Sequence, residues 1–194
     1  SDGACQPNWS PDGQRLVFIS PCPGIQDTYP RASLFIIQLD GTGLLPLVSL
    51  PGGDYDPAWS PDGTTIAFTS LRDGISHIYT YTLADNSVRR LSSSSNYEQH
   101  PAWSPDGQLI AYSTSRLGQP QVWTMAPDGS GAREFSSLNG GIAYSPAWAP
   151  DASILVYVQS PSQRWLVARQ TNNPTASEFK LTERVRPVYD PDFS

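Results

Sequence analysis

Short runs in which apolar and polar residues alternate recur along this chain, and each run ends at a turn rich in Pro, Asp and Gly. The stretch 78–83, Ile-Tyr-Thr-Tyr-Thr-Leu, alternates apolar and polar residues. The stretch 65–70 is rich in β-branched and aromatic residues. Alternation with a period of two is typical of β-strands, and no helical period of useful length occurs. The pattern therefore predicts an all-β protein built from short antiparallel strands.

One phrase, Trp-Ser-Pro-Asp-Gly, marks an internal repeat. It begins at Trp9, Trp59 and Trp103, a decayed copy begins at Trp148, and Phe193 stands at the Trp position of a last, unfinished copy. Successive copies are 50, 44, 45 and 45 residues apart. A fixed period in this range is the signature of a repeat architecture.

Each repeat predicts four strands. In the second repeat, strands are expected at 57–60, 65–70, 78–83 and 88–91. Between the first two, Pro61 suits the second position of a type I turn and Gly63 supplies the positive φ that closes it. The second and third strands of the other repeats are expected at 16–20, 34–39, 109–113, 121–125, 154–159 and 164–169.

A single four-stranded sheet of this size cannot bury both of its faces, but sheets stacked around an axis can, and this arrangement is a β-propeller. The predicted fold is therefore all-β, a β-propeller of four-stranded antiparallel blades, with four complete units plus the first strand of a fifth. Residues 1–194 form one propeller domain or a fragment of one, with units starting near 5, 55, 99 and 144 and a partial unit from 189. The repeated aromatic residues are expected to pack between blades, chief among them Trp9, Trp59, Trp103 and Trp148.

The unfinished fifth unit leaves three interpretations open, because propellers close with about 4 to 8 blades. The chain is a fragment of a longer propeller, or it assembles with other copies through its open edges, or it closes as a four-bladed ring. Unpaired strands at the two ends would expose sheet edges, and such edges invite strand addition from another chain.

Charge and hydropathy narrow the choice of partner. The formal net charge is −6 and the isoelectric point is about 4.7, which argues against nucleic acid because phosphate binding needs clustered Lys and Arg. No apolar stretch approaches the roughly 20 residues needed to span a bilayer. The expected partners are therefore other proteins or further copies of the chain, and the sequence predicts no cofactor.

Two cysteines, Cys5 and Cys22, lie at the same end of two adjacent predicted strands of the first repeat. This placement is compatible with a disulfide, which would imply an oxidising compartment. The alternative is two unrelated buried thiols. Two cysteines with no neighbouring histidine are too few for a structural zinc site.

The first repeat carries an insertion of about six residues between Ser20 and Ser33, and we call the segment that contains it, residues 21–31, the inserted loop. Loops on a rigid scaffold often carry recognition, and this one offers Asp27, Tyr29 and Arg31, a mixture suited to a protein contact. The alternative is a loop that only covers a sheet edge.

Two columns of residues precede the repeated aromatic position. Three residues before it lie Gln6, Asp56, His100, Ser145 and Asp190, and four residues before it lie Cys5, Tyr55, Gln99, Tyr144 and Tyr189. If the Trp-bearing strand is innermost, these residues surround one mouth of the axial channel. They would either line a water-filled channel or bind a cation or the basic group of a peptide, with Asp56, His100, Tyr144 and Asp190 as the contact residues.

Nothing in the sequence selects a catalytic site. His77 and His100 are the only histidines, and no Gly-x-Ser-x-Gly nucleophile elbow occurs. Serines are abundant, but no spacing singles out a Ser-His-Asp triad. The sequence also contains no compact loop with several oxygen ligands of the kind that a hard cation requires. We therefore expect a protein that is not an enzyme and holds no metal.

The whole pattern, Pro-x-Trp-Ser-Pro-Asp-Gly, then Ile-Ala-Phe-x-Ser, then Ile-Tyr or Val-Trp, then Asp-Gly, resembles the TolB-type β-propeller repeat over residues 5–194. The resemblance implies an extracytoplasmic bacterial protein, periplasmic or secreted, that acts as a protein-binding or scaffolding module. Related repeats also occur in the non-catalytic propeller of prolyl-oligopeptidase-like enzymes and in extracytoplasmic sensor tails of membrane proteins. A structural subunit that polymerises, or the propeller part of a larger hydrolase or membrane sensor, are the alternatives.

Overall fold

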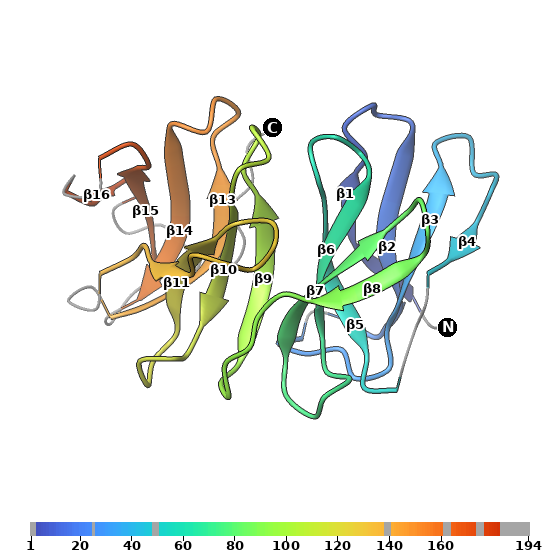
Figure 1. Cartoon of the computed structure of the whole chain (residues 1–194), viewed down its shortest axis with the longest axis horizontal. Coiled ribbons are helices and arrows are strands. Elements are labelled where there is room, and N and C mark those ends of the chain that lie inside the picture. Colours follow the sequence, from blue (N-terminus) through green and yellow to red (C-terminus); the bar gives the residue numbers. More distant parts are fainter. Residues whose placement is uncertain are drawn as a thin grey trace. The chain divides into compact units, whose positions relative to one another are not determined.

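The computed structural model describes residues 3–24, 26–47, 51–137, 141–160, 164–173 and 177–182. These residues form strands joined by turns, with no helix among them (Figure 1). The chain divides into two compact units, Ser1–Ser93 and Ser94–Ser194. The predicted first strand of a fifth repeat, from residue 189, lies outside the described residues.

Each unit contains two antiparallel four-stranded sheets, and in every sheet the strands pair in chain order. The first unit contains β1 (Gly3–Trp9), β2 (Arg15–Cys22), β3 (Ser33–Gln38), β4 (Leu45–Pro46), β5 (Asp54–Trp59), β6 (Thr65–Ser70), β7 (His77–Thr82) and β8 (Ser87–Arg90). The second unit contains β9 (Glu98–Trp103), β10 (Ile110–Thr114), β11 (Gln121–Met125), β12 (Arg133–Glu134), β13 (Ile142–Trp148), β14 (Ile154–Ser160), β15 (Trp165–Gln170) and β16 (Phe179–Lys180). The four sheets are the blades of a β-propeller, as predicted, and we number them blade 1 to blade 4 in chain order.

The Ser-Pro-Asp-Gly turn between the first two strands of a blade is held by its serine and aspartate. In blade 2 the hydroxyl of Ser60 donates to Asp62 over 2.5 Å and accepts from the N–H of Thr65 over 3.0 Å. Asp62 also accepts from the N–H of Thr64, and these bonds, led by that from Ser60, lower the pKa of its carboxyl. Gly63 has φ 70°, which confirms the predicted turn. The same Ser–Asp bond recurs at Ser10–Asp12 and Ser104–Asp106.

Blade 4 keeps this turn without its serine or glycine. Ala152 occupies the glycine position with φ 59°, and its N–H donates to the carbonyl of Ala149 over 2.9 Å. Asp151 still accepts from the N–H of Ser153 over 3.0 Å. The Pro-Asp pair and the closing backbone bonds are therefore enough to form the turn, at the cost of a non-glycine residue in a left-handed conformation.

A β-bulge interrupts the first strand of every blade at the residue that precedes a proline. In blade 1 the pairing passes from Cys5↔Ile19 to Asn8↔Val17, so that two residues of β1 lie opposite one residue of β2. The first residue of the bulge has a positive φ in all four blades: 53° at Gln6, 51° at Asp56, 56° at His100 and 51° at Ser145. These are the described members of the first column predicted above, so this column is a feature of the backbone.

Within each unit the core lies between its two sheets. In the first unit Val17, Ile19, Leu34 and Ile36 of blade 1 pack with aromatic residues of blade 2. In the second unit Ala111 and Val122 pack with residues of blade 4, among them Trp148 and Tyr157. In both units, aliphatic side chains on one face of a blade thus meet aromatic side chains of the next blade.

The prediction that the repeated tryptophans pack between blades is confirmed for Trp59 and Trp148, which are 6% and 8% exposed, whereas Trp103 is half-buried. It is wrong for Trp9, which is 54% exposed. Trp59 packs on blade 1, where the guanidinium of Arg15 lies 4.9 Å from its ring centroid. Trp9 belongs to the first blade, and among the described residues of its own unit no earlier blade exists to cover it.

The blade 4 turn gives a direct test of the backbone argument. Ala152→Gly should stabilise the second unit by about 1 kcal/mol, because a left-handed conformation costs a residue with a Cβ roughly that much. Gly13→Ala, at the same place in blade 1 with φ 67° and open space around it, should destabilise the first unit by a similar amount. Urea unfolding of both variants measures the two changes, and changes of the same sign would contradict the account.

Candidate binding site at the inserted loop

In blade 2 the start of the first strand is tied to the end of the second by a buried ion pair. Arg72 donates to both carboxylate oxygens of Asp54, over 3.0 Å and 3.1 Å, and Ser70 donates to the same carboxylate over 2.6 Å. The Asp54 side chain is fully buried, and this burial raises its pKa, partly offset by the bonds from Ser70 and Arg72. The guanidinium of Arg72 also lies over the ring of Tyr79, 4.6 Å from its centroid.

Blade 3 repeats this arrangement. Arg116 donates to the buried carboxylate of Glu98 over 2.7 Å, and its guanidinium lies 5.0 Å from the ring centroid of Trp123. Counted from the repeated tryptophan, Glu98 and Arg116 stand at the positions of Asp54 and Arg72. We call this tie between the first strand, the end of the second strand and an aromatic ring of the third strand the clasp.

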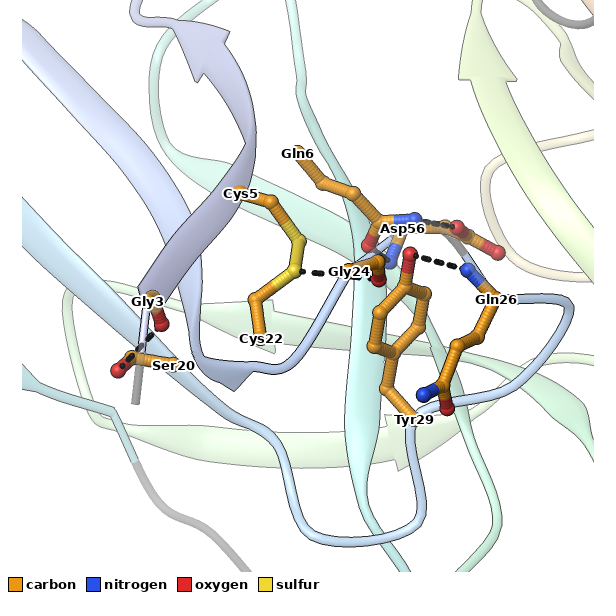
Figure 2. Close-up of a disulfide and its surroundings, with 9 residues drawn as sticks. All are labelled: Gly3, Cys5, Gln6, Ser20, Cys22, Gly24, Gln26, Tyr29 and Asp56. Carbon is orange, nitrogen blue, oxygen red and sulfur yellow. Dashed lines mark hydrogen bonds between the residues drawn. A yellow bond between two sulfur atoms is a disulfide. The ribbon is translucent and has the colours of Figure 1, made fainter. Parts of the chain in front are cut away.

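In blade 1 a disulfide takes the place of the clasp. Cys22 stands at the position of Arg72, and it is bonded to Cys5, with the two Cα atoms 5.9 Å apart (Figure 2). The disulfide interpretation of the sequence is thus the one that the structure supports. Because Cys22 is also where β2 ends, the disulfide fixes the base of the inserted loop.

The other end of the inserted loop is fixed by packing against blade 2. Tyr29 is 5% exposed, and its ring packs on Tyr55 with centroids 5.8 Å apart. Its hydroxyl accepts from the N–H of Gln26 over 3.0 Å, so the side chain also organises the loop itself (Figure 2). The N–H of Asp54 donates to the carbonyl of Ala32 over 2.9 Å, which ties the end of the loop to β5.

Gly53 makes this packing possible. A Cβ added to Gly53 would lie 2.0 Å from the carbonyl oxygen of Tyr29, and the φ of Gly53 is 94°. Only glycine combines this conformation with such a close approach of two backbones. Sequence reasoning did not identify Gly53, although the Gly52-Gly53 pair directly before a strand is the kind of signal that marks a close approach.

Beside the loop, the bulge residues of blades 1 and 2 bind each other. The side-chain amide of Gln6 donates to Asp56 over 2.7 Å and accepts from the backbone N–H of Asp56 over 2.8 Å (Figure 2). Thr69 donates to the other carboxylate oxygen of Asp56 over 2.9 Å. Gln6 follows the disulfide residue Cys5 in the chain, and Asp56 follows Tyr55. The two anchors of the inserted loop are therefore one residue away from the Gln6–Asp56 pair.

The structure places the predicted site residues in different surroundings. Asp27 and Arg31 are exposed on the inserted loop, Asp56 is half-buried, and Tyr29 belongs to the core. Of these, the first unit brings the loop and Asp56 together. His100 and Tyr144 are half-buried on the first strands of blades 3 and 4 in the second unit. Asp190 lies outside the described residues.

Elsewhere in blade 2, His77 takes part in a polar network. Its Nε2 lies 2.8 Å from one terminal guanidinium nitrogen of Arg90, and the other terminal nitrogen donates to Asp73 over 3.0 Å. The hydroxyl of Tyr79 also donates to Asp73. Burial and the bond to Asp73 raise the pKa of Tyr79 to about 12. Since arginine only donates, His77 accepts at Nε2. The network joins β7, β8 and the turn between β6 and β7, and its contacts are those of a structural cluster.

The described residues contain neither a metal-binding cluster nor a membrane-spanning helix. No cluster of three or more His, Cys, Asp or Glu side chains there has the arrangement that a metal ion would need. In the same part of the chain, no helix has the length and apolar character needed to cross a membrane.

Comparison with known proteins shows what the chain is similar to. Residues 4–186 match the family model of the TolB beta propeller domain. No curated protein matches the sequence. Among solved structures, TolB from Acinetobacter baumannii is similar with a TM-score of 0.79 at 21% identity, over 93% of this chain and 44% of that one.

Two further structures show how widely the fold is used. A puromycin-hydrolyzing peptidase of Mycobacterium tuberculosis is similar with a TM-score of 0.75 at 14% identity, over 97% of this chain and 33% of that one. A chain from a nidogen/laminin complex is similar with a TM-score of 0.73 at 14% identity, over 91% of this chain and 64% of that one. The chain thus spans less than half of the Acinetobacter protein and about a third of the peptidase. At these identities the likeness shows the fold alone.

The role of Gly53 can be tested against a matched glycine. Gly53→Ala should destabilise the first unit by about 2 kcal/mol more than Gly74→Ala, because only the former drives a Cβ into a backbone carbonyl. Gly74 has φ 90° and open space around it, so it controls for backbone conformation alone. Urea unfolding measures the loss of unfolding free energy in both variants. Equal losses would show that the backbone of the loop does not approach Gly53 closely.

Proposed function

Since the chain belongs to the TolB β-propeller family, we propose that it is a non-catalytic, extracytoplasmic protein-binding module. Its recognition surface is the inserted loop of the first unit together with the Gln6–Asp56 pair. We call these residues the loop site, with Asp27 and Arg31 as its exposed charges.

The observation that carries this proposal is that the inserted loop is held at both of its ends. The disulfide fixes its start. The ring contact of Tyr29 with Tyr55 and the hydrogen bond from Asp54 to Ala32 fix its end. Asp27 and Arg31 are exposed on a loop whose two ends are already fixed, so a partner that binds them has less of the loop to order. Asp56 adds an acidic group whose position is set by Gln6 and Thr69.

Two further points support the proposal. A disulfide persists in oxidising compartments, which agrees with a periplasmic or secreted protein. Both histidines have other roles in our proposal, because His77 bonds Arg90 in the core of blade 2 and His100 occupies a bulge. The similarity to a peptidase chain, at 14% identity over 33% of its length, gives no reason to assign hydrolysis to this chain.

Site-directed photo-cross-linking tests the loop site. A photoreactive amino acid at position 27, irradiated in an extract of the source cells, should give a discrete protein adduct. The same group at position 85, in the turn between β7 and β8, should give none. Swapping the loop charges with Asp27→Lys and Arg31→Glu should lower binding of the captured protein about tenfold or more, the scale of an interface hot spot. Asp85→Lys with Arg89→Glu is the matched control, and equal adducts or equal losses at both places would refute the proposal.

A second candidate function, self-assembly, is favoured by one observation on blade 1. Trp9 is 54% exposed, and Leu16, Phe18 and Phe35 on the same face are half-buried. The matching residues of blade 2, Trp59, Ile66, Phe68 and Tyr79, are all nearly fully buried. An apolar sheet face of this kind is a surface on which another copy of the chain could pack.

Light scattering over a range of concentrations tests self-assembly. If the Trp9 face joins copies, the mean mass should rise with concentration. Trp9→Ala should then raise the concentration at which association is half complete by at least about tenfold. Leu117→Ser, which removes another exposed apolar side chain, should leave it unchanged. A mass that stays at one chain at every concentration would exclude this candidate and leave the loop site untouched.

A further inference from the structure

The clasp is built differently in blade 1 than in blades 2 and 3. Ala4 stands at the position of Asp54, and the disulfide starts one residue later, at Cys5, where the pairing of β1 with β2 is irregular. Blade 1 keeps Ser20 at the position of Ser70. It also keeps a stacked aromatic pair, Phe18 and Phe35, at the positions of the two rings over which Arg72 lies in blade 2. Only the acid and the arginine are missing. The Cys5–Cys22 disulfide therefore fills the one tie that in the neighbouring blades is an ion pair.

An ion pair and a disulfide respond to different conditions. The Arg72–Asp54 and Arg116–Glu98 pairs are indifferent to thiols, whereas the disulfide is broken by thiol–disulfide exchange. Both cysteines are half-buried rather than buried, and the next residues, Pro23 and Gly24, are exposed. A reducing dithiol can therefore approach the sulfur of Cys22 from the side of the loop.

The two ends of the inserted loop also differ in what holds them. Its second half is fastened by Tyr29 and Ala32, whose contacts with blade 2 contain no sulfur. Its first half emerges directly from the disulfide at Cys22, beside the short pairing of Gly3 with Cys22 at the end of β1. Opening the disulfide removes the covalent cross-link between β1 and this end of the loop.

We propose that the Cys5–Cys22 disulfide is a redox-sensitive clasp that controls the order of the first half of the inserted loop. A reducing dithiol breaks the S–S bond, supplies two electrons and two protons to give the two cysteine thiols, and is itself oxidised to its disulfide. Pro23, Gly24, Gln26 and Asp27 then become mobile, while Tyr29 keeps the second half of the loop in place. This release regulates binding only if the proposed function holds, because Asp27 belongs to the loop site.

Hydrogen exchange followed by mass spectrometry tests this inference without a binding partner. The whole protein is compared with and without dithiothreitol in native buffer. Since the chain has only two cysteines, the reagent has a single target. The amides of Gly24, Gln26 and Asp27 should exchange at least about tenfold faster after reduction, whereas that of Tyr29 should not change. A peptide from β6, in the same unit, should exchange at the same rate in both states.

Two variants sharpen the test. Cys5→Ser with Cys22→Ser should show the fast exchange of the loop without any reductant. Ala4→Asp, Cys5→Tyr, Pro21→Leu and Cys22→Arg together give blade 1 the residues of the blade 2 clasp, and this variant should exchange slowly with and without dithiothreitol. If the second variant fails to fold, the first still decides the question.

Each other outcome overturns the inference. Unchanged exchange of the loop after reduction would show that the disulfide does not control it. Faster exchange of β6 together with the loop would show loss of the whole unit instead of a local release. Exchange is read without a partner, so failure of the loop site in the cross-linking experiment would leave this result standing, and the reverse also holds.

Discussion

The tie between the first strand and the end of the second strand is the constraint on which the first unit depends. In blade 2 it is the Arg72–Asp54 ion pair, whose carboxylate is fully buried and satisfied by Ser70 as well as by the arginine. A buried pair of this kind is costly to break, because removing one partner leaves an uncompensated charge. In blade 1 the same position carries the disulfide, and from it the inserted loop departs. The second strand is therefore tied to the first by an ion pair in blade 2 and by a disulfide in blade 1.

The bulge at Gln6 and Asp56 is the second constraint, and it links backbone strain to the candidate site. A left-handed residue with a side chain is disfavoured, and such residues are found where the surrounding structure holds them in place. Here the two side chains bond each other across neighbouring blades, which contributes to holding both conformations. The same geometry places Asp56 one residue from Tyr55, which packs on Tyr29, and Gln6 one residue from the disulfide.

The sequence predicts the fold well, because its period, its alternation and its turn residues all point to the same four-stranded sheet. It predicts the composition of the site less well. Tyr29 is predicted as a contact residue but lies in the core. The local sequence does not distinguish a loop tyrosine that faces a partner from one that packs on a neighbouring strand, as Tyr29 does on Tyr55. The role of Gly53 depends on a backbone contact with a residue 24 positions earlier in the chain, which no local pattern encodes. Trp9 has the same local sequence as Trp59, and only the packing of blades separates their exposures.

The proposed recognition surface requires that residues 26–31 of the inserted loop be ordered before they meet a partner, and backbone ¹⁵N relaxation of the oxidised protein measures that order. We expect order parameters for these residues close to those of the strands, about 0.85. Values below about 0.6 for these residues would contradict it, because the loop would then be flexible despite both of its anchors.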